Sequence, residues 1–448
     1  MEILALLLFI SIFILILYGF PVAFTLGGIS IIYAILFLDP SAFSALPPRI
    51  MGVMSNYVLL AVPLFIYMGI MLEKSGLAER MLETMGMLFG KIRGGLAISV
   101  VVVGALLAAS TGIVGATVIT MGLISLPTML KRGYKPELAT GTISASGTLG
   151  QIIPPSVVLV LLGSVLNVSV GDLFGAALLP GVLLVVIYII YILIYSFRNP
   201  ENAPAIPAEE IEKFKEGNYW LKIFQAFFLP MILIISVLGS IFTGLASPTE
   251  AAAVGAFGAT ILTVIQGKFN IRILKLVGEE TTHLTCMVFL ILLGATTFSF
   301  VFREMGGDTY LIEMIESSNL HPITFLALVM IVVFVAGFFI DFIEIIFIIV
   351  PVVAPIFLQF EAEFATYHEV FIQRENILIW IGILLAMNLQ TSFLTPPFGF
   401  SLFYLKGVAP PGITTQHLYR GIVPFILIQI VFLVVVIFFP EFIFFFID

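Results

Sequence analysis

The stretch TSFLTPPFGF (residues 391–400) places a proline pair inside an otherwise apolar span, and GTLGQIIPPSV (residues 147–157) does the same earlier in the chain. Proline has no N–H group and cannot sit inside a helix without freeing a backbone carbonyl. Both spans are therefore predicted to unwind locally. A freed carbonyl is costly in lipid, but it is a suitable ligand for a hard cation such as Na⁺ where it lines a cavity.

Composition makes the chain a polytopic membrane protein. Of its 448 residues, 60% are hydrophobic and only 10% are charged, and long apolar runs recur from end to end. A backbone in hydrocarbon must satisfy its own hydrogen bonds, so these runs are predicted to be helices and the fold class all-α. The formal charge of −8 argues against nucleic acid as a partner, and one cysteine and four scattered histidines give no zinc or redox site.

The predicted spans fall into two halves, residues 1–197 and 223–448, joined by a polar, proline-rich linker at residues 198–222. The halves resemble each other, because Pro21 follows the first span as Pro248 follows the seventh, and Pro154-Pro155 has its counterpart in Pro396-Pro397. The simplest interpretation is an internal repeat, which is common among transporters.

Two segments, residues 96–130 and 322–358, are too long for one crossing and too short for two, which need about 40 apolar residues. Each has an interruption near its middle, AASTGIVGAT (residues 108–117) in the first and FFIDFIEII (residues 338–346) in the second. We therefore expect two re-entrant helical hairpins, each dipping into the membrane and returning to the same side. The spans that follow them, at about 136–166 and 376–405, are the broken helices.

Charge tests this topology independently. The loops that flank the first hairpin, residues 73–95 and 131–137, hold seven basic and four acidic residues, whereas those flanking the second, residues 303–321 and 359–375, hold two basic and eight acidic residues. Because basic loops stay inside, the first hairpin is predicted to open to the cytoplasm and the second to the exterior. The repeat is then inverted, and the linker is cytoplasmic.

An inverted repeat with discontinuous helices points to a secondary transporter whose substrate and ion sites lie near mid-membrane. Helix ends at a hairpin tip carry free N–H groups and partial positive charge, which suit a carboxylate. The alternative is that the prolines and glycines merely kink membrane helices. The candidates are Ser110, Thr111, Gly112 and Thr117 in the first tip; Ser144, Ser146, Gly147 and Gly150 beside the first break; and Asn388, Thr391, Ser392, Thr395 and Gly399 beside the second.

Asp341 and Glu344 are acidic residues inside the second hairpin. A charge at mid-bilayer costs roughly 2.5–3.5 kcal/mol, so each should face a polar cavity or a partner. We predict that Asp341 is a Na⁺ ligand, a polar contact to the substrate or a support for the tip. Glu344 is one turn away, on the same helical face if the helix is intact there. The alternative for both is an internal ion pair or a protonated side chain.

Three of these segments resemble a known family. Residues 108–163, GFFIDFIEIIFIIVPVVAPI (337–356) and LTPPFGFSLFYLKGVAP (394–410) closely resemble the large membrane subunit, DctM type, of tripartite ATP-independent periplasmic (TRAP) transporters. The resemblance implies an ion-transporter-type elevator fold and Na⁺-coupled import of small organic anions, mainly carboxylates, across a bacterial or archaeal inner membrane. It also implies two partners, a small membrane subunit (DctQ type) and a periplasmic substrate-binding protein (DctP type). No organic cofactor is expected.

The resemblance also assigns sites. Many relatives have Asp-Pro where this chain has Asp341-Phe342, so the substrate subgroup stays open. Substrate contacts are expected at Ser110, Thr111, Gly112, Thr117, Ser144, Ser146, Asp341 and Thr391. Na⁺ contacts are expected at Ser144, Gly147, Gly150, Pro154, Asp341, Asn388, Thr391, Thr395 and Pro396.

Two other functions compete with that of a transporter. An intramembrane enzyme would need converging catalytic groups, and the chain has neither an H-E-x-x-H nor a G-x-S-x-G motif. A channel for ions or solutes stays open at this point. No Walker motif is present, which fits an ion gradient rather than ATP as the energy source.

Overall fold

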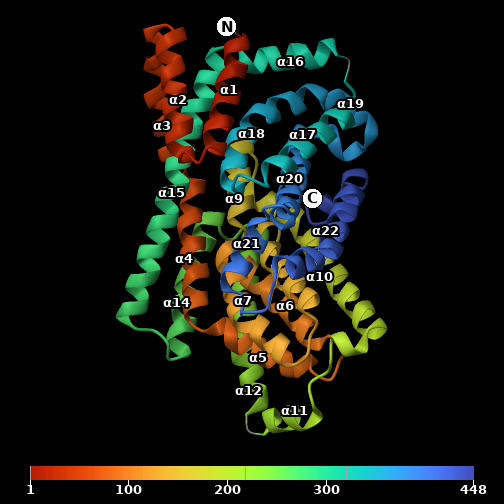
Figure 1. Cartoon of the computed structure of the whole chain (residues 1–448). Coiled ribbons are helices and arrows are strands. Elements are labelled where there is room, and N and C mark those ends of the chain that lie inside the picture. Colours follow the sequence, from red (N-terminus) through yellow and green to blue (C-terminus); the bar gives the residue numbers. More distant parts are fainter. Residues whose placement is uncertain (1, 113, 217, 319, 448) are drawn as a thin grey trace.

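The computed structural model describes residues 2–112, 114–216, 218–318 and 320–447, and within them it consists of helices and loops without a strand (Figure 1). Nine helices of this described part are long and apolar enough to cross a membrane. The prediction of an all-α membrane protein is therefore confirmed.

One group of helices, here called the lateral bundle, stands at the left of Figure 1. Its members are α1 (Glu2–Leu17), α2 (Val22–Phe37), α3 (Leu46–Met54), α4 (Ala61–Lys74), α13 (Leu229–Phe242), α14 (Pro248–Ile265) and α15 (Ile271–Glu304). The long helix α15 packs along α2 and α4, and α14 packs along α4 and α13. Glycine permits one of these approaches, because a Cβ built on Gly294 would lie 2.5 Å from the carbonyl oxygen of Ala23.

A second group, the hairpin bundle, consists of the two hairpins, the two interrupted helices and the helices α10 and α22. Its members are α6 (Gly95–Thr111), α7 (Val114–Lys131), α8 (Pro136–Thr148), α9 (Val157–Leu166), α10 (Val170–Arg198), α17 (Pro322–Ala336), α18 (Phe342–Phe357), α20 (Arg374–Leu394), α21 (Phe400–Val408) and α22 (Thr415–Phe438). Residues 377–394 of α20 are all buried, so this helix is part of the core. Helices α8 and α22 touch backbone to backbone, since a Cβ on Gly141 would lie 2.1 Å from the carbonyl oxygen of Gly421.

The first hairpin consists of α6 and α7, and both of its ends lie against the linker. The backbone N–H of Gly94 donates to the carbonyl of Ala203 at 3.0 Å, and that of Lys135 donates to Asn202 at 3.0 Å. Beside the same ends, the N–H of Leu96 donates to the Tyr134 hydroxyl at 3.2 Å. Burial raises the pKa of Tyr134 to about 12, so the hydroxyl stays neutral. The chain therefore enters and leaves this hairpin on one side.

The second hairpin consists of α17 and α18, and its ends lie at the opposite end of the molecule. The rings of Phe325 and Phe357, near the start of α17 and the end of α18, have centroids 4.9 Å apart. These ends lie near α16 (Gly307–Ser317) and α19 (Glu361–Tyr367) at the top of Figure 1, whereas the linker helix α11 (Ala208–Lys215) lies at the bottom. The two hairpins thus enter from opposite ends.

Pro154-Pro155 and Pro396-Pro397 each interrupt a helix, as the sequence predicts. Helix α8 ends at Thr148 and continues as one 3₁₀ turn, η3 (Leu149–Gln151), before α9 begins at Val157. Helix α20 ends at Leu394, and α21 begins at Phe400. Both proline pairs, which have cis peptide bonds, lie in these gaps. The two breaks are neighbours, because α20 packs against η3.

Short helices fill segments that were expected to be loops. Helix α5 (Leu77–Phe89) lies between α4 and the first hairpin and buries Leu77, Met81 and Met85 against the bundle. The span expected to begin at residue 223 begins at Tyr219, because α12 (Tyr219–Ile223) continues through a π-helical turn, η5 (Phe224–Phe228), into α13. The other short elements are α23 (Glu441–Phe444) and the 3₁₀ segments η1 (Pro40–Ala45), η2 (Tyr57–Leu60), η4 (Pro200–Asn202), η6 (Leu358–Phe360) and η7 (Glu369–Ile372).

Candidate functional site

A cavity of about 280 Å³ lies where the two hairpin tips meet the two helix breaks. The first tip contributes Gly112 and Val114, and the second contributes Asp341 and Phe342. The breaks contribute residues on their flanks, among them Val157 at the start of α9. The lateral bundle closes one side with Ile66 of α4 and with Leu284, Met287 and Val288 of α15. This is the place that the sequence predicts for substrate, and we call it the central cavity.

Three helices begin at the central cavity. Val114, Val157 and Phe342 are the first residues of α7, α9 and α18, and all three line it. The first turn of a helix has N–H groups without intrahelical partners and carries partial positive charge, so it attracts an anion. Helix α9 has no side-chain cap, because the hydroxyl of Ser156 donates to the carbonyl of Gln151 at 2.9 Å instead.

The first tip is built for close approach. Gly112 ends α6 with a left-handed φ of 61°, and a Cβ there would lie 2.8 Å from Cγ2 of Val157. Glycine is therefore required both by conformation and by space. The Thr111 and Thr117 hydroxyls lie 2.8 Å apart, and the Ser110 hydroxyl donates to Leu107 of its own helix at 2.8 Å. Of the four predicted tip residues, only Gly112 lines the central cavity as the structure describes it.

Asp341 precedes α18 rather than lying within a helix. Its Oδ1 accepts from the N–H of Phe342 at 2.7 Å. Asp341 and Glu344 also form a capping box, in which the Asp341 side chain accepts from the Glu344 N–H and the Asp341 N–H donates to Oε2 of Glu344 at 3.3 Å. The helix is not intact at Asp341, so the condition on which the two acids were expected to share a helical face is not met. A short polar side chain just before a helix caps its first N–H groups, and an acid three residues later accepts from the N–H of that capping residue.

The two acids therefore have different surroundings. Asp341 is half-buried and is the one charged residue among the described residues that line the central cavity, whereas Glu344 lies outside that lining. The cavity carries no basic side chain in this described lining. Positive potential for an anion must then come from helix ends or from a bound cation.

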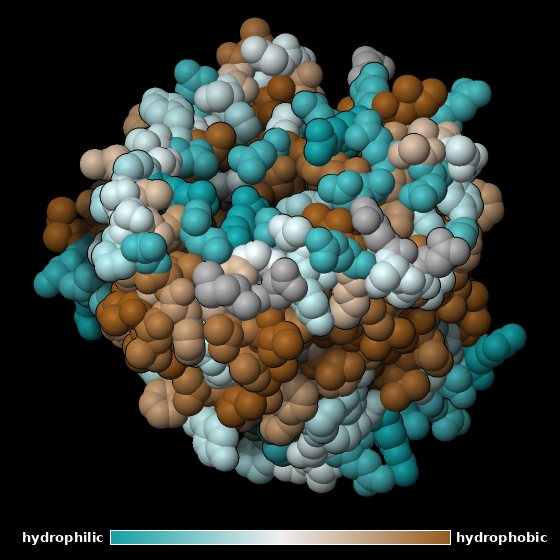
Figure 2. Space-filling model, turned by 90° about the horizontal axis from the view of Figure 1, so that it is seen from above, coloured by the Kyte–Doolittle hydropathy of each residue, from teal (hydrophilic) through white to brown (hydrophobic). Residues whose placement is uncertain are grey.

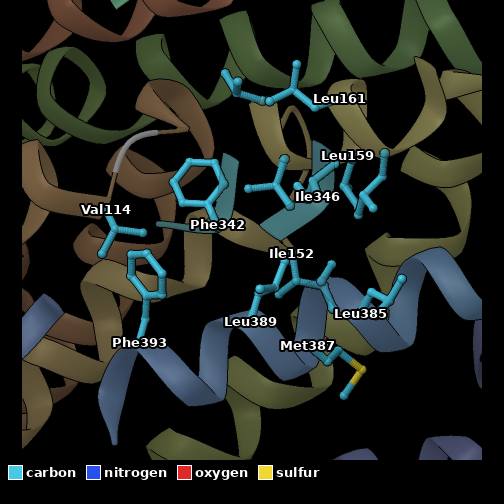
Figure 3. Close-up of a cluster of buried hydrophobic side chains, with 14 of the residues drawn as sticks. Val114, Ile152, Leu159, Leu161, Phe342, Ile346, Leu385, Met387, Leu389 and Phe393 are labelled. Carbon is cyan, nitrogen blue, oxygen red and sulfur yellow. The ribbon is translucent and has the colours of Figure 1, made fainter. Parts of the chain in front are cut away.

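Aromatic residues close the central cavity towards the second break. Figure 3 shows Val114, Phe342 and Phe393 pointing toward one another. The ring centroids of Phe342 and Phe393 are 5.8 Å apart, and those of Phe393 and Phe400 are 5.0 Å apart. Tyr404 of α21 lines the same cavity. These rings connect the second tip to both sides of the second break.

Buried amides gather at the breaks. Gln151, in η3, and Gln390, near the end of α20, are 0% and 1% exposed. Within the described part of the chain, neither amide has a hydrogen-bond partner, and the same is true of the hydroxyls of Thr142 and Ser144. An unsatisfied buried polar group costs about 1–3 kcal/mol, so these oxygens suit a bound cation or ordered water.

Some of the residues predicted beside the first break provide space rather than side-chain ligands. A Cβ on Gly147 would lie 2.3 Å from Cγ2 of Val118, and a Cβ on Gly150 would lie 2.4 Å from the carbonyl oxygen of Ala108. The hydroxyl of Ser146 donates to its own helix, to the carbonyl of Ile143 at 3.0 Å. The first break is thus held tightly against the first hairpin.

Ser144 links the first break to the second. Its carbonyl oxygen accepts from the Ser401 hydroxyl of α21 at 3.1 Å. Pro154 lies in the gap between η3 and α9, outside the described lining of the central cavity. A cation at the breaks would therefore contact residues from both halves of the chain.

The second break is tied to the second hairpin. The Asn388 amide donates to the carbonyl of Met330 in α17 at 2.7 Å. The hydroxyls of Thr391 and Thr395 donate to carbonyls four residues earlier at 2.9 and 2.8 Å. A hydroxyl that donates in this way keeps its lone pairs for a cation. Pro396 lies in the gap before α21.

Sequence reasoning missed Gln151, Gln390 and Tyr404. The available signal was an isolated amide or hydroxyl group inside an apolar span, which must find a partner when it is buried. Among the described residues, no group of three or more histidine, cysteine or acidic side chains could hold a metal ion. The unpaired buried polar groups at the breaks are hydroxyl and amide groups.

Comparison with known proteins gives one family. Residues 9–442 match the sequence profile described as "Tripartite ATP-independent periplasmic transporter, DctM component". The chain is 31% identical over 414 residues to the C4-dicarboxylate TRAP transporter large permease protein DctM of Pseudomonas aeruginosa, covering 92% of this chain and 91% of that protein. It is also 31% identical over 459 residues to the protein of the same name from Vibrio cholerae, with 97% and 95% covered.

Other matches vary in the substrate that they name. They include an ectoine/5-hydroxyectoine permease of Ruegeria pomeroyi at 28% identity and a sialic acid permease of Vibrio cholerae at 26%. Among solved structures, the fold is similar to that of the YdaH transporter of Alcanivorax borkumensis, with a TM-score of 0.62 at 14% identity over 94% of this chain and 98% of that one.

Proposed function

Because this chain belongs to the DctM family of tripartite ATP-independent periplasmic transporters, we propose that it is the permease subunit of a Na⁺-coupled secondary transporter that imports a small organic anion. The family's members are transport proteins rather than enzymes. The observation that carries this proposal is the central cavity, where three helices begin and both helix breaks converge.

The anion would bind in the central cavity through main-chain groups. Its carboxylate would accept hydrogen bonds from N–H groups in the first turns of α7 and α9, which begin at Val114 and Val157. The Asp341 carboxylate would repel an anion directly, so a cation between them is needed to hold both. This charge requirement couples the substrate to Na⁺.

Na⁺ would bind at the breaks themselves. The buried oxygens of Gln151, Gln390 and Ser144, together with carbonyls freed by the proline pairs, form a neutral oxygen-rich environment. Asp341 supplies a charge beside it. This arrangement fits a monovalent hard cation better than a transition metal, which prefers nitrogen or sulfur ligands.

We further propose an elevator movement. The lateral bundle lines one side of the central cavity with apolar residues only, namely Ile66, Leu284, Met287 and Val288. The polar groups described above belong to the hairpin bundle. An apolar wall makes no directional bonds with the cargo, so the hairpin bundle could slide past it with the cargo enclosed between the tips.

The partners and the location follow from the family. We propose that the chain is a multi-pass protein of the bacterial or archaeal inner membrane and works with a DctQ-type small membrane subunit and a DctP-type periplasmic binding protein. Phe24 and Ile35 of α2 are 68% and 67% exposed, so this face is suited to lipid or to the small subunit. The relatives are named as permeases for C4-dicarboxylates, ectoine and sialic acid. We propose that the substrate of this chain is a small carboxylate.

Reconstitution tests the proposal. Proteoliposomes containing the chain and its small subunit would receive binding protein loaded with radiolabelled succinate, ectoine or sialic acid. We expect uptake of at least one of these that requires an inward Na⁺ gradient and is absent with a K⁺ gradient of equal size. Flux that needs neither the gradient nor the binding protein would overturn the proposal and indicate a channel.

A further inference from the structure

A second, larger cavity of about 620 Å³ opens at the end of the molecule where the second hairpin has its base. Figure 2 views the molecule from this end and shows hydrophilic residues gathered around a hollow. The cavity is formed by α3, by the final turns of α9, α15 and α18, and by the start of α20. We call it the vestibule.

The vestibule is positively charged in a chain that is negative as a whole. Arg49, Arg303 and Arg374 line it, and no acidic residue belongs to its lining among the described residues, although the chain carries a net charge of −8. Neutral polar groups complete the lining, among them Asn167 and Ser299. Like charges gathered in a concave surface focus the field and raise the local concentration of anions.

These arginines are largely free to bind a ligand. The Arg49 guanidinium lies over the ring of Phe300, 4.8 Å from its centroid. Arg374 makes one long ion pair, 3.8 Å from its Nε to Oε2 of Glu361. Arg303 makes no ion pair or side-chain hydrogen bond with the described residues. Guanidinium groups bind carboxylates through paired hydrogen bonds, so this set suits a carboxylate.

The vestibule and the central cavity lie along the same pair of helices. On α18, Phe347 lines the vestibule and Ile343 lines the central cavity; on α15, Leu292 and Val288 have the same relation. Four residues are about one helical turn, or roughly 6 Å along the axis. Only about one turn of apolar side chains therefore separates the two cavities.

We propose that the vestibule is an entry site, in which the arginines bind the carboxylate of the incoming organic acid before it moves between α15 and α18 into the central cavity. This inference rests on the proposed function, because it assumes that the central cavity receives an anion. The positive lining holds the anion on the outer side, and the helix N-termini receive it inside.

Thiol labelling tests the vestibule without requiring transport. Ser299 is half-buried and lines the vestibule, so Ser299→Cys in a Cys286→Ser background places a single reactive thiol there. The full-length protein would be labelled with anionic and cationic methanethiosulfonates. Arg303→Gln removes one positive charge, and Arg272→Gln at the other end of α15, where Arg272 is exposed, is the matched control.

We expect the anionic reagent to label Ser299→Cys faster than the cationic reagent. Arg303→Gln should lower the ratio of the anionic to the cationic labelling rate about five-fold, which is the effect of removing one charge at about 8 Å in water. Succinate should slow labelling, whereas neutral succinamide should not. Protection by succinate should be lost in Arg303→Gln and kept in Arg272→Gln.

Three results would overturn the inference: no protection by succinate, equal protection by succinamide, or protection that survives Arg303→Gln. Protection by the ligand-free binding protein but not by succinate would also overturn it, and would make the vestibule a docking surface for an acidic protein. Labelling needs no Na⁺ gradient, so its failure is distinct from failure of the uptake experiment.

Discussion

Replacing Asp341 by asparagine removes a charge from the central cavity without removing the cap that begins α18. The Asp341 side chain caps α18 by accepting from the N–H of Phe342 at 2.7 Å and from the N–H of Glu344, and asparagine caps helices about as well as aspartate. The free energy of unfolding of Asp341→Asn should therefore stay within about 0.5 kcal/mol of the wild type. Asp341→Ala has no acceptor and should lower it by about 1 kcal/mol.

The effect of Asp341→Asn on Na⁺ binding follows from Coulomb's law. A cation about 4–6 Å from the carboxylate gains about 3–4 kcal/mol at an effective dielectric of about 20. Asp341 is half-buried, and halving this value for screening leaves about 1.5–2 kcal/mol. The Na⁺ concentration for half-maximal uptake should then rise roughly 10- to 30-fold.

The assay combines Na⁺-dependent uptake in proteoliposomes with thermal unfolding of the same samples. Asp308→Asn is the control, because Oδ1 of Asp308 also accepts from the following N–H, that of Thr309 at 3.0 Å, but lies outside the described lining of the central cavity. Unchanged Na⁺ dependence in Asp341→Asn, with lower stability only in Asp341→Ala, would show that Asp341 acts as a helix cap and nothing more.

Three further predictions concern the breaks and the two bundles. Replacing Pro396-Pro397 by Ala-Ala should restore helix and weaken the Na⁺ dependence of uptake by about ten-fold or more, measured by the same assay. Gly150→Ala should lower the free energy of unfolding by about 1–3 kcal/mol, measured by denaturation, because its Cβ would lie 2.4 Å from a backbone oxygen. Cysteines at Asn56 and Ser164, whose side chains are hydrogen-bonded at 3.1 Å between the two bundles, should stop uptake when joined by a short thiol cross-linker and recover it on reduction.

Each of these has a result that would contradict it. An unchanged Na⁺ response in the Ala-Ala variant would remove the second break from the ion site. Gly278→Ala on α15 has open space around it and should be tolerated, so equal losses in Gly278→Ala and Gly150→Ala would deny the close approach at the break. Full uptake with the cross-link in place would rule out sliding of the bundles at that contact.

The fold was largely predictable because the helix breaks and the re-entrant hairpins each leave a recognisable pattern in the sequence. A proline pair in the middle of an apolar span, as at Pro154-Pro155 and Pro396-Pro397, interrupts the helix there. A segment of intermediate length with a polar middle is expected to satisfy its backbone as a hairpin. The short helices α5 and α11 were harder to predict from the sequence. Their segments carry the charge and polarity of loops, and helix formation there depends on packing against the bundle.

The meeting of tips and breaks was predictable from the sequence, whereas the substrate and Na⁺ contacts stay predictions. Gly112 and Asp341 line the central cavity. Ser110 and Ser146 donate to their own helices instead, because a serine hydroxyl has a carbonyl three or four residues earlier within reach. Gln151 was missed because its burial depends on contacts far apart in the sequence.

The central claim is that two interrupted helices hold a cation beside an anionic cargo. The most direct measurement is an experimental density map of the full complex in Na⁺ with bound substrate, compared with one in choline. The account predicts Na⁺-dependent density between the backbone at residues 149–156 and 391–397, with the substrate carboxylate at the first turns of α7 and α9. Continuous helix through either proline pair, or substrate bound away from both hairpin tips, would contradict it.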